Sequence, residues 1–340
     1  MTQRRVYLDV GPGEGRGVVT LEGQPERLLI DRSGVDRGPR LGARYIARID
    51  EIAPGLGLAY LDLGGGERAV LAPPRNSALA RGAAIEVEVT AEARGDKAAA
   101  VKVLGPGSGP PGLVAQAPLL EARLTAAAPG VAVTQGAEAR EVADEAQAAA
   151  LEVLHHLPGG LRLHVEPTAA LVAVDLDWSG AGAGPAALKA NLRGLGHAAR
   201  LLRLKSLGGT VVIDLIGFPG REAGAVLAEA RRVFEPDQPG VSVLPVSRLG
   251  LLELSLPHRE RPIREQLCGA DGQPSARTVA QGLARDMERQ AKADPGARVT
   301  GVCSPETAAA LEPLVLAMGP RFEVALELGW SRLKTDIRIR

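Results

Sequence analysis

Aromatic side chains are scarce in this chain: two tryptophans, three tyrosines and three phenylalanines stand among 340 residues. Its hydrophobic cores must therefore be built from leucine, valine, isoleucine and alanine. The scarcity also limits one way of binding single-stranded nucleic acid, because stacking on aromatic rings contributes roughly 1–3 kcal/mol per base. We expect only a modest intrinsic affinity for such strands.

Other absences exclude whole classes of protein. The two cysteines, Cys268 and Cys303, provide neither a disulfide framework nor a zinc cluster. The sequence has no run of about 18 apolar residues and no apolar leader after Met1, so we expect a cytoplasmic protein without a membrane partner. The 40 basic and 40 acidic residues cancel, so any surface that binds nucleic acid must be local.

Two short apolar runs that contain aspartates are the most informative feature that is present. Residues 170–177 include Asp175 and Asp177, and residues 208–214 end on Asp214. Both runs predict buried strands, and side chains two residues apart share one face of a strand. If the strands pair, three carboxylates converge at one sheet end, where their charge requires a cation such as magnesium or manganese. The simpler interpretation is that the aspartates only end strands at a solvated edge.

Residues 42–103 predict a small β-barrel of the OB type, because five short strands are separated by turns rich in glycine and proline. The expected strands are residues 44–49, 58–63, 68–71, 84–89 and 98–103. Such barrels bind single strands through exposed aromatic rings and cationic side chains. The aromatic candidates are Tyr45 and Tyr60, and the cationic candidates are Arg44, Arg48, Arg68, Arg94 and Lys97. Both tyrosines could instead be core residues; we expect at least one at the surface.

The rest of the chain predicts alternating strands and helices. Strands are expected at residues 6–10 and 18–21, and the glycine-rich residues 11–17 between them form a hairpin turn rather than a phosphate-binding loop. Helices are expected at residues 137–154 and 222–234, and strands at 161–165 and 241–244. Residues 105–112 predict a linker without helix or strand. Residues 276–340 predict helix, strand, helix, strand, strand, which is a compact α/β module.

A basic helix is expected at residues 185–207, between the two aspartate strands. Four cationic side chains lie on it, and no acidic residue intervenes between the first and the last of them: Arg193, Arg200, Arg203 and Lys205. A cationic helix beside a carboxylate cluster would attract a polyanionic substrate toward a bound metal ion. The alternative is an ordinary solvated helix face.

Four segments resemble the ribonuclease E/G family. Residues 202–216, with Gly208-Gly209 ahead of Asp214, are similar to its LRLRxLGGxIxIDFI pattern. Residues 171–177 resemble ALxxIDxN, after a similar Leu-Pro-Gly-Gly at 157–160. Residues 247–254 resemble SxxGLxEM, and residues 53–64 resemble RVxPxxxAAFVDIG. These segments occur in the family's order over most of the chain.

The resemblance implies an α+β, multidomain fold. An OB-fold RNA-binding barrel (residues 41–104) would be inserted into a reduced RNase H-like element (residues 1–40 and 113–165), with a linker at residues 105–112. A deoxyribonuclease-I-like α/β catalytic subdomain would follow at residues 166–267, and a small C-terminal α/β domain at residues 276–340.

The resemblance also implies a magnesium-dependent endoribonuclease that cuts single-stranded RNA. The family's two metal-binding aspartates match Asp175 and Asp214, and its metal-site asparagine matches Asp177. The expected catalytic residues are therefore Asp175, Asp177 and Asp214. Tyr60 matches a stacking phenylalanine, Lys97 a basic residue of the barrel, and Asn191 a family asparagine. The expected RNA ligands are Tyr60, Arg94, Lys97, Asn191, Arg200, Arg203 and Lys205.

Several departures from the family bear on activity. Asp177 changes a neutral amide into a carboxylate, Arg193 replaces an acidic residue, and Gly217 replaces a second aspartate. The zinc-binding CPxCxG is reduced to residues 268–272 with one thiol, so zinc is not expected. A homodimer is compatible with the sequence, whereas the family's zinc-linked tetramer is not expected. The stretch between the linker and Leu157 is too short for the family's 5′-sensing domain.

The leading interpretation is a metal-dependent endoribonuclease that acts in RNA processing or decay. The alternative from another class is a non-catalytic RNA-binding protein on a decayed nuclease fold. The three surviving carboxylates favour the enzyme, and Arg193 and Gly217 favour the binding protein. A metal-dependent DNA phosphodiesterase is a weaker third interpretation, because nothing in the sequence indicates recognition of a duplex.

Overall fold

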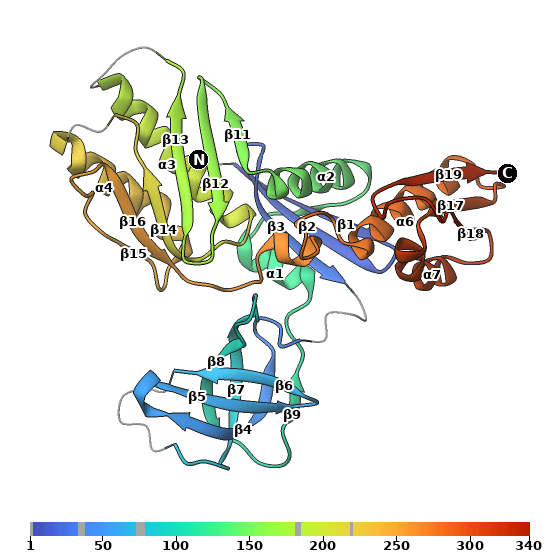
Figure 1. The fold of residues 1–340 in the computed structure, drawn as a ribbon, viewed down its shortest axis with the longest axis horizontal. Helices are drawn as coiled ribbons and strands as arrows, with labels where there is room; N and C mark the ends of the chain where they lie inside the picture. The colour runs from blue at the N-terminus through green and yellow to red at the C-terminus, as the bar shows by residue number, and fades with distance from the viewer. Residues whose placement is uncertain (1–2, 33–37, 73–78, 181–184, 218–219) are drawn as a thin grey trace.

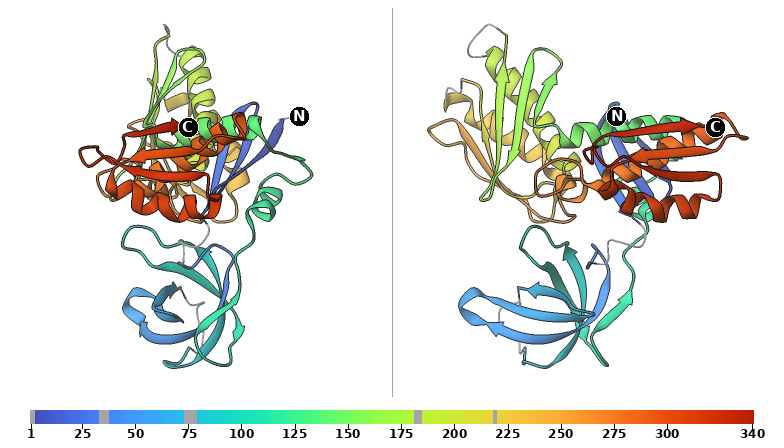
Figure 2. Two further views of the ribbon diagram at one scale, coloured as in Figure 1. Left: turned by 90° about the vertical axis from the view of Figure 1, so that its right-hand side faces the viewer. Right: turned by 45° about the vertical axis from the view of Figure 1, so that its right-hand side comes forward.

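The computed structural model describes residues 3–32, 38–72, 79–180, 185–217 and 220–340. Two mixed layers of sheet and helix form the body, with a small C-terminal module at one end of the long axis (Figure 1). A β-barrel lies below the body in every view (Figure 2). No helix within the described ranges combines the length and apolar character needed to cross a membrane.

The first sheet is a β-meander with one parallel strand at its edge. Its strands are β1 (Arg4–Gly11), β2 (Glu14–Leu21), β3 (Gln24–Arg32) and β10 (Val133–Thr134), in the order β10-β1-β2-β3. The predicted hairpin is confirmed, since β1 and β2 pair antiparallel around Pro12 and Gly13. Helix α1 (Leu120–Ala127) packs on one face, and α2 (Ala137–Leu151) packs on the other. The sheet therefore contributes to two cores, one through Val19 and one through Val18.

The barrel is inserted between β3 and α1, as the sequence predicts. Its strands are β4 (Arg44–Ala53), β5 (Leu58–Gly64), β6 (Glu67–Leu71), β7 (Ala84–Ala91), β8 (Ala99–Pro106) and β9 (Gly112–Ala115), with the 3-10 turn η1 (Pro54–Leu56) after β4. The five expected strands are confirmed, and a pairing of β5 with β4 closes the barrel. Alternate residues point inward, so Tyr45 is a core residue with 8% of its surface exposed.

The second sheet has the order β11-β12-β13-β14-β16-β15. These strands are β11 (Leu154–Leu157), β12 (Leu161–Pro167), β13 (Val172–Trp178), β14 (Gly209–Asp214), β15 (Ser242–Val243) and β16 (Leu251–Leu256). Helices α3 (Pro185–Leu204) and α4 (Ala223–Val233) share a core with one face of the sheet. The 3-10 turns η2 (Gly220–Glu222) and η3 (Glu235–Asp237) flank α4. Side chains on the other face, including His164, Asp175 and Glu253, are exposed.

The C-terminal module has the predicted order of helix, strand, helix, strand, strand. After the short α5 (Ile263–Leu267), it contains α6 (Ala276–Ala293), β17 (Val299–Cys303), α7 (Pro305–Met318), β18 (Phe322–Leu326) and β19 (Thr335–Ile339). Its sheet has the order β18-β17-β19. Both long helices begin at a serine cap, where Ser275 accepts a hydrogen bond from the Thr278 amide and Ser304 from the Thr307 amide.

The prediction of a linker without helix or strand at residues 105–112 is wrong. Residues 105–112 are not a free linker, because β8 extends to Pro106 and β9 begins at Gly112, where the chain pairs with β4 at the barrel edge. Strand β3 and strand β11 were not expected. Strands β11 and β12 pair with β13, so the second sheet begins at residue 154.

Buried charges connect the modules. Glu14 on β2 accepts hydrogen bonds from Arg32 of β3 at 2.5 Å and from Arg285 of α6, and its side chain is fully buried. Burial raises the pKa of Glu14, but the two guanidinium groups lower it by more, so its pKa lies below the usual value. Because Arg285 belongs to the C-terminal module, this carboxylate holds that module against the first sheet.

The barrel is fixed to the body by a second buried glutamate. Glu92 follows β7 and accepts hydrogen bonds from the Arg40 side chain at 2.9 Å and from the Arg261 amide at 3.1 Å. Its own amide donates to the carbonyl of Arg259 at 2.8 Å. The segment after β16 therefore holds the barrel against the body.

We predict that Glu14→Gln lowers the free energy of unfolding by about 3–5 kcal/mol at neutral pH, because a neutral amide leaves two buried guanidinium groups uncompensated. In the native protein, the lowered pKa means that this contribution is present above the unfolded value near 4.5 and is lost as the pH falls through the folded pKa. Urea unfolding of wild type and variant between pH 3 and 7 measures both effects. Glu229→Gln, which removes a surface pair with Arg232, is the control and should change stability by about 0.5 kcal/mol or less.

Candidate active site

The candidate active site begins with a register between two parallel strands. Asp175 of β13 lies directly opposite Asp214 of β14. The alternating residues Val174 and Leu176 are buried on the helix side, so Asp175 is directed to the open face of the sheet. Neighbouring strands are about 4.8 Å apart, which places the two carboxylates side by side. The sequence predicts a convergence of three carboxylates; the register brings two of them, Asp175 and Asp214, opposite each other.

The two carboxylates fit a hard divalent cation that keeps several water ligands. Both side chains are exposed, and their like charges favour a cation between them. Among the described residues, no group of three or more His, Cys, Asp or Glu side chains is arranged to hold a metal ion. Magnesium commonly takes one or two carboxylates and completes its shell with water and phosphate oxygens. Asp175 and Asp214 would therefore be the protein ligands of such an ion.

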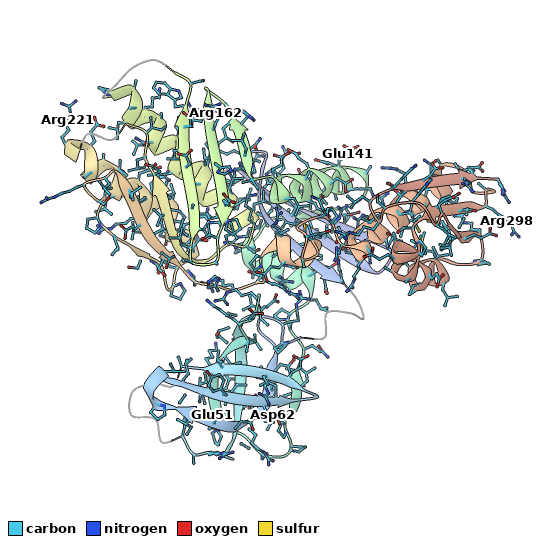
Figure 3. All side chains as sticks on the ribbon, in the orientation of Figure 1. Glu51, Asp62, Glu141, Arg162, Arg221 and Arg298 are labelled. Atoms are coloured by element: carbon cyan, nitrogen blue, oxygen red, sulfur yellow. The ribbon has the colours of Figure 1, made fainter. Side chains whose placement is uncertain are left out.

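Asp177 shares the open face but is engaged elsewhere. Its Oδ2 accepts a hydrogen bond from Arg162 of β12, which lies opposite it, and its Oδ1 accepts one from the Trp178 amide at 2.7 Å. Arg162 is visible near the top of the second sheet (Figure 3). Sequence reasoning did not single out Arg162, because the pairing of β12 with β13 across the four-residue turn 168–171 was the missing information.

Asn191 has a supporting role that differs from RNA binding. It lies on α3 and is 1% exposed. Its Nδ2 donates to the carbonyl of Ile216, and its Oδ1 accepts from the amide of Ile216, both at 2.9 Å. Ile216 follows Asp214 by two residues, so this amide clamp fixes the segment that leaves the carboxylate pair.

The cationic helix face that the sequence predicts is absent at three positions. Arg200 is buried and donates to the carbonyl of Pro25 at 2.7 Å. Lys205 is buried and donates to the terminal carbonyls of α2, including that of Ala150 at 3.1 Å. The prediction fails here because the C-terminal half of α3 packs against β3 as well as against the second sheet.

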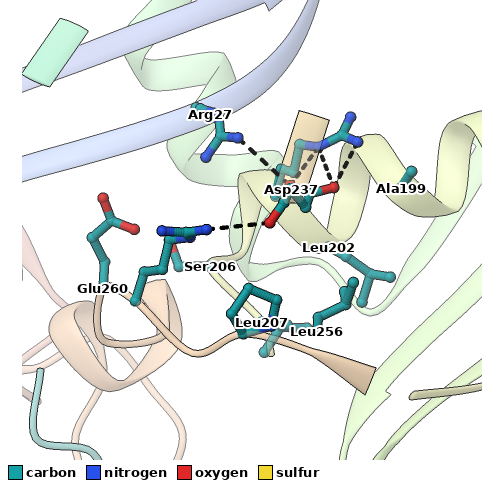
Figure 4. A pocket seen from close by; sticks show the side chains of 11 residues that line it. Arg27, Ala199, Leu202, Ser206, Leu207, Asp237, Leu256 and Glu260 are labelled. Atoms are coloured by element: carbon teal, nitrogen blue, oxygen red, sulfur yellow. Dashed lines mark hydrogen bonds and ion pairs between the residues drawn. The ribbon is translucent and has the colours of Figure 1, made fainter. Parts of the chain in front are cut away.

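Arg203 is likewise committed to the interior. It donates to both carboxylate oxygens of Asp237 and, at 2.9 Å, to Glu26. Arg27 also approaches Asp237, and Figure 4 shows the contacts of Asp237 around the small pocket beside α3. Arg203 therefore stabilises the junction of β3, α3 and η3 and does not present its charge to solvent.

Two of the predicted RNA ligands of the barrel, Tyr60 and Arg94, line two separate grooves. Tyr60 on β5 is 37% exposed, as expected for at least one tyrosine, and lines a groove with three cationic side chains that lie on different segments: Arg48, Arg68 and Arg81. Arg94 lines another groove, together with Arg261 and Arg264 of the body. Arg94 and Lys97 pair in a short hairpin of the barrel, and Lys97 is exposed. The amide of Gly95 at the tip of this hairpin donates to Glu265 at 2.9 Å.

The Tyr60 groove and the carboxylate pair are not adjacent. Asp175 is the middle residue of β13 and Asp214 ends β14, so the pair lies part-way up the second sheet, whose strand β13 has its carboxyl end at the top of Figure 1. The barrel lies beneath the opposite end of the sheet in both further views (Figure 2). The structure therefore separates the expected RNA-binding surface from the expected metal site.

The part of the chain that matches a known protein family contains the second sheet. Residues 134–261 match the family model described as "Ribonuclease E/G family". This range contains α2, strands β11 to β16 and both Asp175 and Asp214, but not the barrel. The resemblance to the ribonuclease E/G family is thus confirmed for the segment that carries the carboxylate pair.

Individual relatives agree with this assignment. The chain is 38% identical to ribonuclease E of Haemophilus influenzae over 104 residues, which are 29% of this chain and 11% of that protein. It is 33% identical to ribonuclease E of Escherichia coli over 141 residues, which are 39% of this chain and 12% of that protein. Ribonuclease E of Buchnera aphidicola from Acyrthosiphon pisum is 31% identical over 141 residues, 39% of this chain and 15% of that protein. The matched segment thus spans a small part of each relative.

We predict that Asn191→Ala destabilises the protein by about 1–3 kcal/mol, because the variant leaves buried backbone groups of Ile216 without partners. Hydrogen exchange at the Ile216 amide should accelerate by a corresponding factor. Arg193→Ala, on the same helix but exposed, removes only a bond to the Pro158 carbonyl and should leave that exchange unchanged. Equal exchange at Ile216 in the wild type and Asn191→Ala would contradict the clamp.

Proposed function

We propose that this protein is a metal-dependent endoribonuclease that cleaves single-stranded RNA in RNA processing or decay. The observation that supports it best is the register of Asp175 with Asp214 on an open sheet face, within the segment that matches the ribonuclease E/G family. In this proposal the first sheet is the reduced RNase H-like element, the barrel an OB fold, and the second sheet the deoxyribonuclease-I-like catalytic subdomain.

The chemistry requires a cation, for which magnesium and manganese are the candidates. When bound, the ion would stabilise negative charge on the phosphate and lower the pKa of a coordinated water. The residues of this chain act around it. Asp175 and Asp214 would hold the ion, Asn191 keeps the segment after Asp214 in place, and Asp177 would accept a hydrogen bond from water once its contact with Arg162 opens.

RNA is held at a distance from the metal ligands. Tyr60 would stack on a base, and the arginines that line its groove would neutralise neighbouring phosphates. Lys97 and Arg94 would contact the strand at the junction of barrel and body. The buried candidates contribute to this proposal only through stability: Arg200 and Arg203 of α3, and Lys205 just after it.

The proposal also covers zinc binding, subunit assembly and cellular location. Cys268 lies just after α5, and Cys303 is buried at the end of β17 in the C-terminal module. We therefore propose that the protein needs no zinc, and that subunits, if they pair, form a homodimer without a zinc link. A location in the cytoplasm also remains a proposal.

We predict that Asp175→Asn and Asp214→Asn each abolish magnesium-dependent cleavage of a labelled single-stranded RNA. Each substitution removes one of two anionic ligands, so calorimetric binding of manganese should weaken as well. Glu166→Gln changes a carboxylate on the same face, opposite Ala173, and is the matched control. RNA binding without cleavage by the wild type would instead support the non-catalytic RNA-binding protein, and cleavage of a deoxy counterpart at an equal rate would support the DNA phosphodiesterase.

We predict that Tyr60→Ala weakens binding of an unstructured RNA by about 1–3 kcal/mol, because it removes a stacking ring. Tyr60→Phe keeps the ring and should bind as the wild type does. Fluorescence anisotropy in EDTA measures the affinity without cleavage. Equal affinities for all three proteins would exclude the Tyr60 groove as the RNA-binding surface.

A further inference from the structure

We propose that Arg162 binds an RNA phosphate next to the one at the Asp175–Asp214 pair, and that Asp177 holds Arg162 in place until the RNA arrives. This inference rests on the proposed function, since it names a second phosphate position in the same site. It assigns Arg162 as a substrate-contacting residue and Asp177 as its positioning partner.

The strand register puts Arg162 on the correct face. It lies opposite Asp177, and His164, two residues further along β12, lies opposite Asp175. Asp175 in turn lies opposite Asp214. Residues two apart along a strand are about 7 Å from each other, a spacing comparable to that between successive phosphates of an RNA strand. An RNA phosphate beside the one at the carboxylate pair would therefore meet Arg162.

The charges of this face favour such a contact. Exposed or half-exposed carboxylates dominate it: Glu166, Asp175, Asp177, Asp214 and Glu253. A polyanionic strand is repelled by this surface except where a cation compensates. Arg162 is the one arginine or lysine within the six strands of the second sheet, all of which the structure describes. The protein has no other fixed positive charge in these strands to offer the RNA.

The Arg162–Asp177 contact can be exchanged for a phosphate. Both side chains are about half exposed, at 47% and 49%, and exposed ion pairs are weak because water competes for both partners. A guanidinium group has five N–H donors in a planar fork that fits two phosphate oxygens. Only the bond from Nη2 to Asp177 Oδ2 is formed by this group within the described part of the chain. Phosphate can therefore take the fork while Asp177 is released.

The test measures binding of an unstructured RNA in EDTA as a function of salt concentration, for wild type, Arg162→Ala, Asp177→Asn and the double variant. Arg162→Ala should weaken binding by about 5- to 10-fold and reduce the magnitude of the salt slope by about 0.7, the value for one phosphate contact on a single strand. Asp177→Asn should strengthen binding, because it removes a negative charge and frees Arg162. The double variant should bind more weakly than Asp177→Asn.

The control is Arg232→Ala, which removes an exposed arginine that is also paired with a carboxylate, but on α4. It should leave the affinity and the salt slope unchanged. An unchanged salt slope in Arg162→Ala, or the same loss in Arg232→Ala, overturns the inference. Cleavage of RNA by the wild type is assayed in parallel. If the wild type cleaves RNA but Arg162→Ala leaves the salt slope unchanged, only this inference is overturned. If Arg162→Ala reduces the salt slope but the wild type does not cleave RNA, only the nuclease proposal is overturned.

Discussion

The parallel pairing of β13 with β14 is the constraint on which the candidate site depends. Two parallel neighbours require a crossover, and α3 provides it by packing on the sheet between them. Buried residues such as Val174 and Ile213 fix the register from the helix side. A slip of one residue would turn every side chain of a strand to the other face, and it would carry one aspartate into the core. The hydrophobic face thus determines where the carboxylates lie.

The sequence predicts the strands and their faces well, because alternation and turn residues are local signals. The strands of the barrel, the aspartate strands and the whole order of the C-terminal module follow from them. Strand β11 was missed because its two histidines interrupt an apolar run that is only four residues long. The expected linker failed because glycine and proline are tolerated at the barrel edge, where β9 pairs with one neighbour.

The site residues show where local reasoning ends. Charge pattern along α3 indicates a basic helix, but only packing reveals that Arg203 is directed inward to Asp237 and Glu26. Likewise, the pattern of the family suggests an RNA contact at Asn191, whereas the side-chain amide of Asn191 forms hydrogen bonds with the backbone of Ile216. Gly217 next to it has a positive φ of 44°, a conformation that suits glycine. Long side chains and amides take their partners from segments far away in sequence, which no periodicity encodes.

The separation of the Tyr60 groove from the carboxylate pair has a consequence for the length of RNA that the proposed function requires. A strand that fills both places must reach from the barrel along the body to the middle of the open face of the second sheet. The barrel cannot shorten that path while Glu92 and Glu265 hold it against the segment after β16. The protein would then select RNA by length. A short fragment would bind either the Tyr60 groove or the carboxylate pair but not both, so the products of earlier cuts would compete weakly with long substrates.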